Sequence, residues 1–276
     1  RYRRQDVGAR LLQLRARAPA RVRERPVARP KPEDLEQTAP QPLLVALWRI
    51  SLDLGRHPDD VEVPMLSEVV AEFGGLQRAL RKQDRLFDQT LLEQARAVRA
   101  EDLRLYFAIL QFSKRPRYRQ LEPRLQRDVK AFFGDYASAQ TAGLRLLSEA
   151  ADPAVLLKAC QEAAEHGLGS LDGDHDLQLH VSLVDRLPPV LRAYVACGLQ
   201  LYGDLTAVDL VKIHIGSGKL SLMQFENFGG SPLPAMRRRV KVNVRRADYE
   251  VFEYGGEYPM PLLYNKSRFL NEESAT

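Results

Sequence analysis

The stretch LVKIHIGSGKLSLMQFE, residues 210–226, decides the fold class that the sequence predicts for the second half of the chain. Apolar residues alternate with other residues on both sides of the GSG at 216–218, which is the pattern of two half-buried strands joined by a turn. Side chains alternate between the two faces of a strand, so Lys212 and His214 lie together on one face if their apolar neighbours form the core. Lys219, at the end of the turn, can join them.

This predicted hairpin has two interpretations. Backbone N–H groups of a glycine turn beside lysines suit a phosphate group. The sequence GSGK nevertheless lacks the spacing and the following Ser/Thr of a P-loop, and it stands between two strands rather than before a helix. We therefore do not expect nucleoside triphosphate binding. A phosphate contact and an ordinary hairpin kept soluble by its lysines both remain open.

A second basic stretch, MRRRVKVNVRRA at 236–247, predicts another strand. Its alternation places the valines inward and Lys241, Asn243 and Arg245 outward. Cations on the outer face, preceded by three arginines, suit a phosphate backbone, and the nearby aromatic residues Tyr249, Phe252 and Tyr254 could stack on bases. The alternative is a solvated edge strand that its charges protect against pairing with another chain.

The rest of the chain predicts an α+β fold, with a helical N-terminal half followed by a mainly antiparallel, β-rich C-terminal half. Helices are expected at 42–54, 67–73, 75–82, 84–98, 101–112, 121–134, 137–149, 153–165 and 187–204. Strands are expected at 177–183, 210–215, 220–225, 239–245 and 249–254. The domain organisation predicted from these patterns is a basic, Pro-rich linker at 1–41, a helical subdomain at 42–166 and a β-rich subdomain with a basic face at 167–276.

The net charge of +5 hides a segregation along the chain. Residues 1–31 carry 11 Lys and Arg against 2 acidic residues, and residues 210–246 carry 8 against 1. Such basic segments suggest a polyanion as partner, although the first could be only a solvated linker. The chain begins at Arg1 within this basic run, so we expect it to be part of a longer protein.

The composition indicates a cytosolic protein. Its apolar runs are shorter than the ~20 residues that a membrane helix needs, so no membrane span is expected. Cys160 and Cys197 lack CxxC spacing and are expected to be reduced thiols. Asp174, His175 and Asp176, with His180, could ligate a metal, but aspartates in a turn usually cap their own backbone, and we predict no metal site. No nucleophile motif appears, and no catalytic residue is predicted.

Several segments resemble one protein family. They are LGRHPDDVE at 54–62, FGG at 73–75, DVKAFFGDY at 128–136, LPPVLRAYVACGLQLYGD at 187–204, DLVKIHIGSGKLSLMQFENF at 209–228 and LLYNKSRF at 262–269. In this order they resemble the C-terminal region of the DNA phosphorothioation-associated, methyltransferase-like proteins of bacteria. The resemblance implies a cytoplasmic DNA-modification or defence protein, DNA as partner, and an upstream domain of the same parent chain that uses S-adenosylmethionine.

The chain departs from that family where catalysis would lie. It has neither a glycine-rich cofactor loop after a first strand nor an Asn/Asp-Pro-Pro-Tyr or Pro-Cys motif. We therefore predict a non-catalytic region without a cofactor of its own, which contacts the DNA backbone or positions the substrate. The residues predicted to contact nucleic acid are Lys212, His214, Lys219, Arg237, Arg238, Arg239, Lys241, Arg245, Lys266 and Arg268.

Two other hypotheses compete with this one. In the first, the chain is a scaffold whose acidic helical half docks the catalytic domain or a defence partner. In the second, it is an independent enzyme that uses His180, His214 and nearby aspartates with a metal. The sequence makes no prediction about the oligomeric state.

Overall fold

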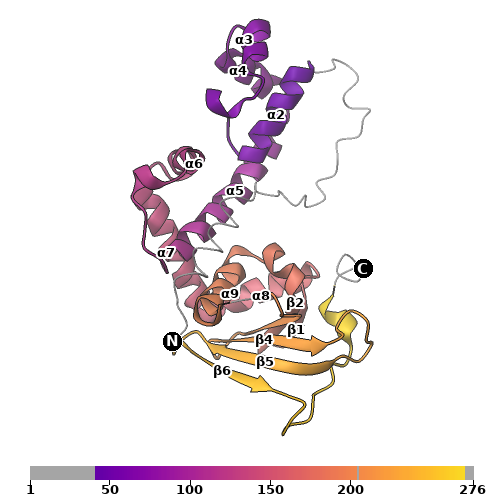
Figure 1. The fold of residues 1–276 in the computed structure, drawn as a ribbon. Coiled ribbons are helices and arrows are strands. Elements are labelled where there is room, and N and C mark those ends of the chain that lie inside the picture. Colours follow the sequence, from indigo (N-terminus) through magenta and orange to yellow (C-terminus); the bar gives the residue numbers. More distant parts are fainter. Residues whose placement is uncertain (1–40, 204, 271–276) are drawn as a thin grey trace.

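The computed structural model describes residues 41–203 and 205–270, and nearly all of the predicted linker at 1–41 lies outside the described residues. Figure 1 shows a body, in which helices lie on one face of a sheet, and an arm of helices that projects away from it. The predicted α+β class is confirmed, with helices mainly in the N-terminal half and an antiparallel sheet in the C-terminal half.

The arm begins with three α-helices and a short 3-10 helix. They are α2 (Pro42–Leu54), η2 (Asp60–Glu62), α3 (Leu66–Phe73) and α4 (Leu76–Leu86). Helix α2 ends where predicted, because Gly55 takes the left-handed conformation that closes a helix. The small core of the arm is apolar and includes Leu44, Leu47, Val69 and Leu80.

Helix α5 (Gln89–Leu110) joins the arm to the body. Its 22 residues correspond to a rod of about 33 Å. The sequence pattern predicted two helices here, at 84–98 and 101–112, and that prediction was wrong. No glycine or proline interrupts the segment, and the helix begins where the side chain of Asp88 accepts a hydrogen bond from the backbone N–H of Thr90.

The remaining helices pack around the second half of α5 and the sheet. They are η3 (Tyr118–Gln120), α6 (Pro123–Phe133), α7 (Tyr136–Ala151), α8 (Pro153–Glu165), η4 (Val181–Arg186), α9 (Pro189–Tyr202) and η5 (Lys266–Phe269). Helices α5 and α7 approach closely at Gly143, where an added Cβ atom would lie 2.5 Å from the carbonyl carbon of Phe107. A larger residue would not fit between the two helices, so glycine is required where they cross.

A buried ion cluster holds the arm against α6. Asp128 is fully buried and accepts a hydrogen bond of 2.8 Å from Arg56 and one of 2.6 Å from Arg99. Arg56 also binds both carboxylate oxygens of Glu62. Burial alone would raise the pKa of Glu62, but hydrogen bonds from Arg56 and the backbone of Asp59 lower this pKa to about 2.

The sheet is antiparallel, and its six strands lie in sequence order. They are β1 (Ser170–Asp172), β2 (Asp176–His180), β3 (Leu210–His214), β4 (Lys219–Glu226), β5 (Ala235–Asn243) and β6 (Asp248–Glu253). Strand β2 ends earlier than the predicted 183, because the ring of His180 accepts the backbone N–H of Ser182 and starts η4. The three-residue strand β1 was not predicted.

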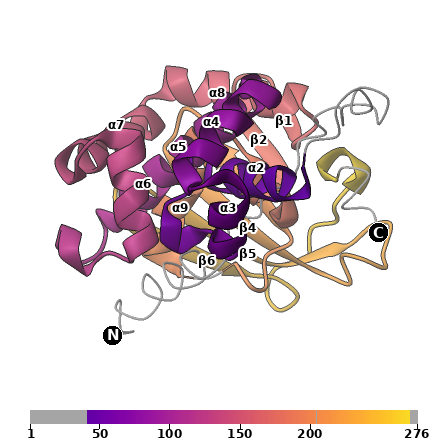
Figure 2. The same cartoon turned by 90° about the horizontal axis from the view of Figure 1, so that it is seen from above.

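The two faces of the sheet have different neighbours. Alternate residues of β2 to β5, such as Val211 and Val240, pack with residues of α5, α7, α8 and α9 in the largest core. Figure 2, viewed from above, shows the helices gathered over this face. The core continues across the predicted boundary near 166, so the helical and β-rich parts share it. Among the described residues, no helix is long and apolar enough to span a membrane.

Candidate nucleic-acid interface

The strand register gathers lysines on the face of the sheet that points away from the helices. Lys212 on β3 pairs with Ser221 on β4, and Ser221 pairs with Lys241 on β5. Directly paired residues of antiparallel strands share a face, so these three side chains form one row across the sheet. The next row places His214 beside Lys219. The predicted hairpin therefore brings its three basic side chains together, and it adds Lys241 from the neighbouring strand.

Ser221 lies at the centre of this group and is completely buried. Its Oγ atom accepts hydrogen bonds from Nε and Nη2 of Arg239, at 3.3 and 3.1 Å. The same oxygen lies 2.9 Å from Nε2 of His214. Arginine can only donate, so the hydroxyl hydrogen of Ser221 is free to be donated to a neutral His214. Ser221 thus holds one residue from each flanking strand.

His214 belongs to this group but does not contribute a positive charge at neutral pH. Burial and, after it, the positive charge of Lys212 lower the pKa of its ring to about 4, while Asp176 opposes the shift. A neutral ring with Nε2 unprotonated is the form that accepts a hydrogen from Ser221. The charged residues of the site are therefore Lys212, Lys219, Arg239 and Lys241, which we call the cationic strip.

The members of the cationic strip differ in their partners. Nζ of Lys212 lies 2.9 Å from a carboxylate oxygen of Asp176 on β2, so its charge is balanced. Within the part of the chain that the structure describes, Lys219 and Lys241 form no ion pair. Arg239 forms no ion pair within the same residues either, but its guanidinium donates to Ser221, so the two lysines have the most to gain from an added anion.

Carboxylates border the cationic strip on both sides. The row through His214 and Lys219 ends at Asp172 and Asp176 on one side and at Asp248 on β6 on the other. In the row through Ser221, Lys241 pairs with Glu250 of β6. The positive region therefore covers only the three central strands, β3 to β5.

Several predicted contact residues lie elsewhere. Arg238 binds Glu253 at 2.8 Å, and its guanidinium lies 5.9 Å from the ring centre of Tyr202 on α9, so it belongs to the helix side. Nζ of Lys266 donates to the backbone carbonyls of Phe228, Gly229 and Ser231 and thus holds a loop. Neither residue joins the cationic strip.

The other predicted arginines, Arg237, Arg245 and Arg268, are exposed. The side chain of Arg245 lies against Gly218 in the turn between β3 and β4. Sequence reasoning missed Ser221 and Asp176 as parts of the site. A serine alternating with lysine and leucine in KLSL was the signal for the first, and only the register of β2 and β3 could reveal the second.

Two of the residues considered for a metal site make other contacts. Asp176 binds Lys212, and the ring of His180 contacts the hydroxyl of Ser182 and stacks on Phe228 with 5.4 Å between ring centres. Within residues 41–203 and 205–270, no group of three or more His, Cys, Asp or Glu side chains is arranged to hold a metal ion.

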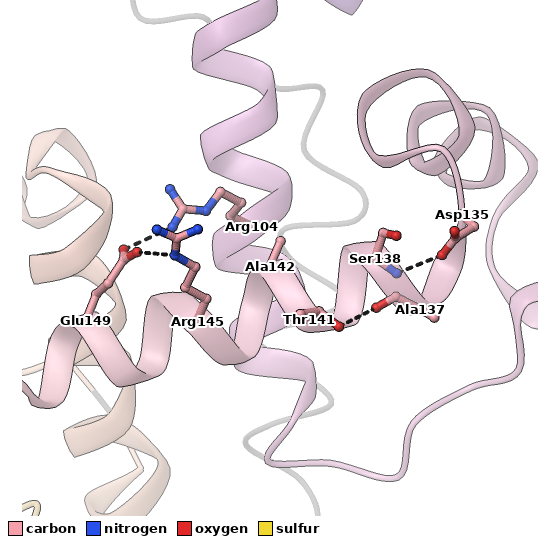
Figure 3. Close-up of a pocket in the computed structure, with 8 residues that line it drawn as sticks. All are labelled: Arg104, Asp135, Ala137, Ser138, Thr141, Ala142, Arg145 and Glu149. Carbon is pink, nitrogen blue, oxygen red and sulfur yellow. Dashed lines mark hydrogen bonds and ion pairs between the residues drawn. The ribbon is translucent and has the colours of Figure 1, made fainter.

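A hollow of about 650 Å³ lies along α7 beside Arg104 of α5, and its polar groups already bind one another. Figure 3 shows that Arg104 and Arg145 both point to Glu149. At the other end of the hollow, Asp135 accepts the backbone N–H of Ser138 at the start of the helix. The arginines have a carboxylate partner already, so this hollow is a weaker anion site than the cationic strip.

Comparison with known proteins gives no relative for this chain: it matches no protein-family model, no curated protein and no solved structure. The fold and the site define an α+β protein with a cationic strip on the sheet face opposite the described α-helices, where Phe269 of η5 covers the neighbouring Leu210 and Met223.

Proposed function

We propose that this chain is a non-catalytic region that contacts a nucleic-acid backbone through the cationic strip. One observation carries the proposal. Among the described residues, the register of β3, β4 and β5 places four cations on a face that no α-helix covers, and Lys219 and Lys241 have no ion-pair partner there. Phosphate groups would supply the missing counter-charges, and the counterions that they release favour binding.

The proposal includes the biological setting implied by the resemblance to DNA phosphorothioation-associated, methyltransferase-like proteins. In that setting the partner is DNA in the cytoplasm, and a methyltransferase domain upstream in the same parent chain binds S-adenosylmethionine. The structural support for this proposal is the cationic strip, which lies across three adjacent strands.

A salt titration of DNA binding tests this proposal. Affinity of the chain for a short fluorescent DNA should fall steeply as salt rises, and the Lys219→Glu, Lys241→Glu double variant should bind at least tenfold more weakly with a shallower slope. The matched control is the double variant Lys130→Glu, Lys158→Glu. It makes the same charge change at exposed positions of α6 and α8.

The control should retain most of the affinity, because its lysines lie on helices outside the strip. Equal losses in the two double variants would show that only net charge matters and would overturn the proposal. Binding that does not respond to salt would overturn it as well.

A further inference from the structure

We propose that the ligand of the cationic strip is a single nucleic-acid strand rather than a duplex, and that one base stacks on Phe252. This inference rests on the proposed function and narrows it. Phe252 on β6 pairs directly with Arg239 on β5, so its ring lies on the same face as the strip. The side chain is 40% exposed, and the hydrophobic cluster next to Met223 does not include it.

The width of the cationic strip favours binding of one nucleic-acid backbone over binding of the two backbones of a duplex. Strands β3 and β5 are separated by two strand spacings, about 10 Å. Beyond them lie the carboxylates of Asp176 on one side and of Asp248 and Glu250 on the other. A single backbone that runs along β4 lies between these two borders, and the Asp176 carboxylate on its near side is already balanced by Lys212 at 2.9 Å. A duplex carries two backbones, and the second would lie over like charges or lose contact with the sheet.

The position of Phe252 matches the geometry of single-strand binding. Proteins that bind single strands combine a positive track for the backbone with an aromatic ring beside it for the bases. Here Arg239 and Lys241 form one side of the track, and Phe252 stands on the next strand, directly opposite Arg239. In a duplex the base faces are stacked within the helix, so Phe252 would find no partner there.

The other aromatic residue of β6 serves as an internal comparison. The ring of Tyr249 packs against that of Tyr202 on α9, with 5.5 Å between ring centres and 75° between their planes, so it lies on the helix side of the sheet. Tyr249 is 48% exposed, similar to Phe252, and differs from it mainly in the face that it occupies.

The experiment measures binding of the full chain to a labelled oligothymidylate and to a labelled duplex of equal length by fluorescence anisotropy. The single strand should bind at least several-fold more tightly. Phe252→Ala should weaken single-strand binding by about 5- to 100-fold, as expected for the loss of one stacked base, and should change duplex affinity by less than about twofold. Phe252→Tyr should restore single-strand binding, because it keeps an aromatic face.

Two control variants separate stacking from general damage. Phe252→Leu keeps an apolar side chain without the ring and should behave like Phe252→Ala. Tyr249→Ala removes a ring from the opposite face of the same strand and should leave oligothymidylate affinity unchanged. Equal affinity for the two nucleic acids, with Phe252→Ala neutral, overturns the single-strand inference and leaves the proposed function standing. Absence of salt-dependent binding to either one overturns both.

Discussion

Nη2 of Arg239 lies 3.1 Å from Oγ of Ser221, and this hydrogen bond joins β5 to the centre of β4 beneath the cationic strip. Removal of the Ser221 hydroxyl leaves Arg239 and His214 without their shared hydrogen-bond partner. Ser221 is fully buried, so water does not readily take the place of this hydroxyl. We expect Ser221→Ala to lower the free energy of unfolding by about 1–3 kcal/mol. Urea unfolding followed by far-UV circular dichroism measures this change.

The matched control is Ser217→Ala, in the exposed turn between β3 and β4, which should change stability by less than about 0.5 kcal/mol. In a double-mutant cycle, the effects of Ser221→Ala and Arg239→Leu should be less than additive, because the two side chains form one bond. If the two effects on the free energy of unfolding were fully additive, this hydrogen bond would contribute nothing to stability.

Stability should depend on pH through His214. The pKa of its ring is about 4 in the folded chain and about 6.5 when unfolded, so between these values the unfolded chain binds a proton that the folded chain does not. The contribution of the neutral ring to the free energy of unfolding is therefore complete above pH 6.5 and is lost as the pH falls toward 4. We expect a loss of about 1–2 kcal/mol, because solvent around the partly buried ring weakens the effect.

The measurement compares unfolding of the wild type and His214→Gln from pH 7 to pH 4. The variant should show a smaller decline over this interval, and His175→Gln, at an exposed position before β2, should decline like the wild type. A decline in His214→Gln as steep as that of the wild type would contradict the assignment.

Affinity for nucleic acid should rise when Asp176 loses its charge. Asp176→Asn frees Lys212 from its 2.9 Å ion pair and removes one carboxylate from the border of the strip. We expect a several-fold gain in affinity and a salt slope steeper by about 0.7 to 0.9, the value of one added phosphate contact. The control Asp53→Asn, on the exposed side of α2, makes the same charge change in the arm. An unchanged slope in Asp176→Asn would exclude Lys212 from the interface.

The attachment of the arm should depend on Asp128. Asp128→Ala leaves Arg56 and Arg99 without their buried carboxylate and should cost about 3–5 kcal/mol. Trp48, the single tryptophan of the chain, stacks on Phe87 within the arm, so its fluorescence reports arm unfolding directly. Arg145→Ala breaks an ion pair whose arginine side chain is 79% exposed and should change stability by no more than about 0.5 kcal/mol.

Hydrophobic periodicity in the sequence predicted much of the fold. It failed where a helix packs on different elements along its length. In β5 the alternation of Val240 and Val242 with polar residues identified the buried face correctly. In α5 the apolar pattern shifts because its first half packs on α2 and its second half on α7 and α9. That shift suggested two helices where there is one. Strand β1 is too short for any period to emerge.

The candidate site was predictable only within single strands. Alternation alone predicted that Lys212 and His214 share a face, and the turn added Lys219. The position of Lys241 beside Ser221 depends on the register between β4 and β5, which a bulge between Gln224 and Phe225 shifts. The neutral state of His214 arises from its burial in the assembled sheet, so no local pattern could predict it.

The carboxylates of β6 have a second consequence. This strand forms an edge of the sheet, all six of its residues are exposed, and it carries Asp248, Glu250 and Glu253 without a single cation. If two copies met edge to edge at β6, their carboxylates would face one another and repel. Asp248 and Glu250, which narrow the cationic strip, therefore also discourage growth of the sheet into a longer assembly, and they leave strands with a basic sequence as the preferred neighbours of that edge.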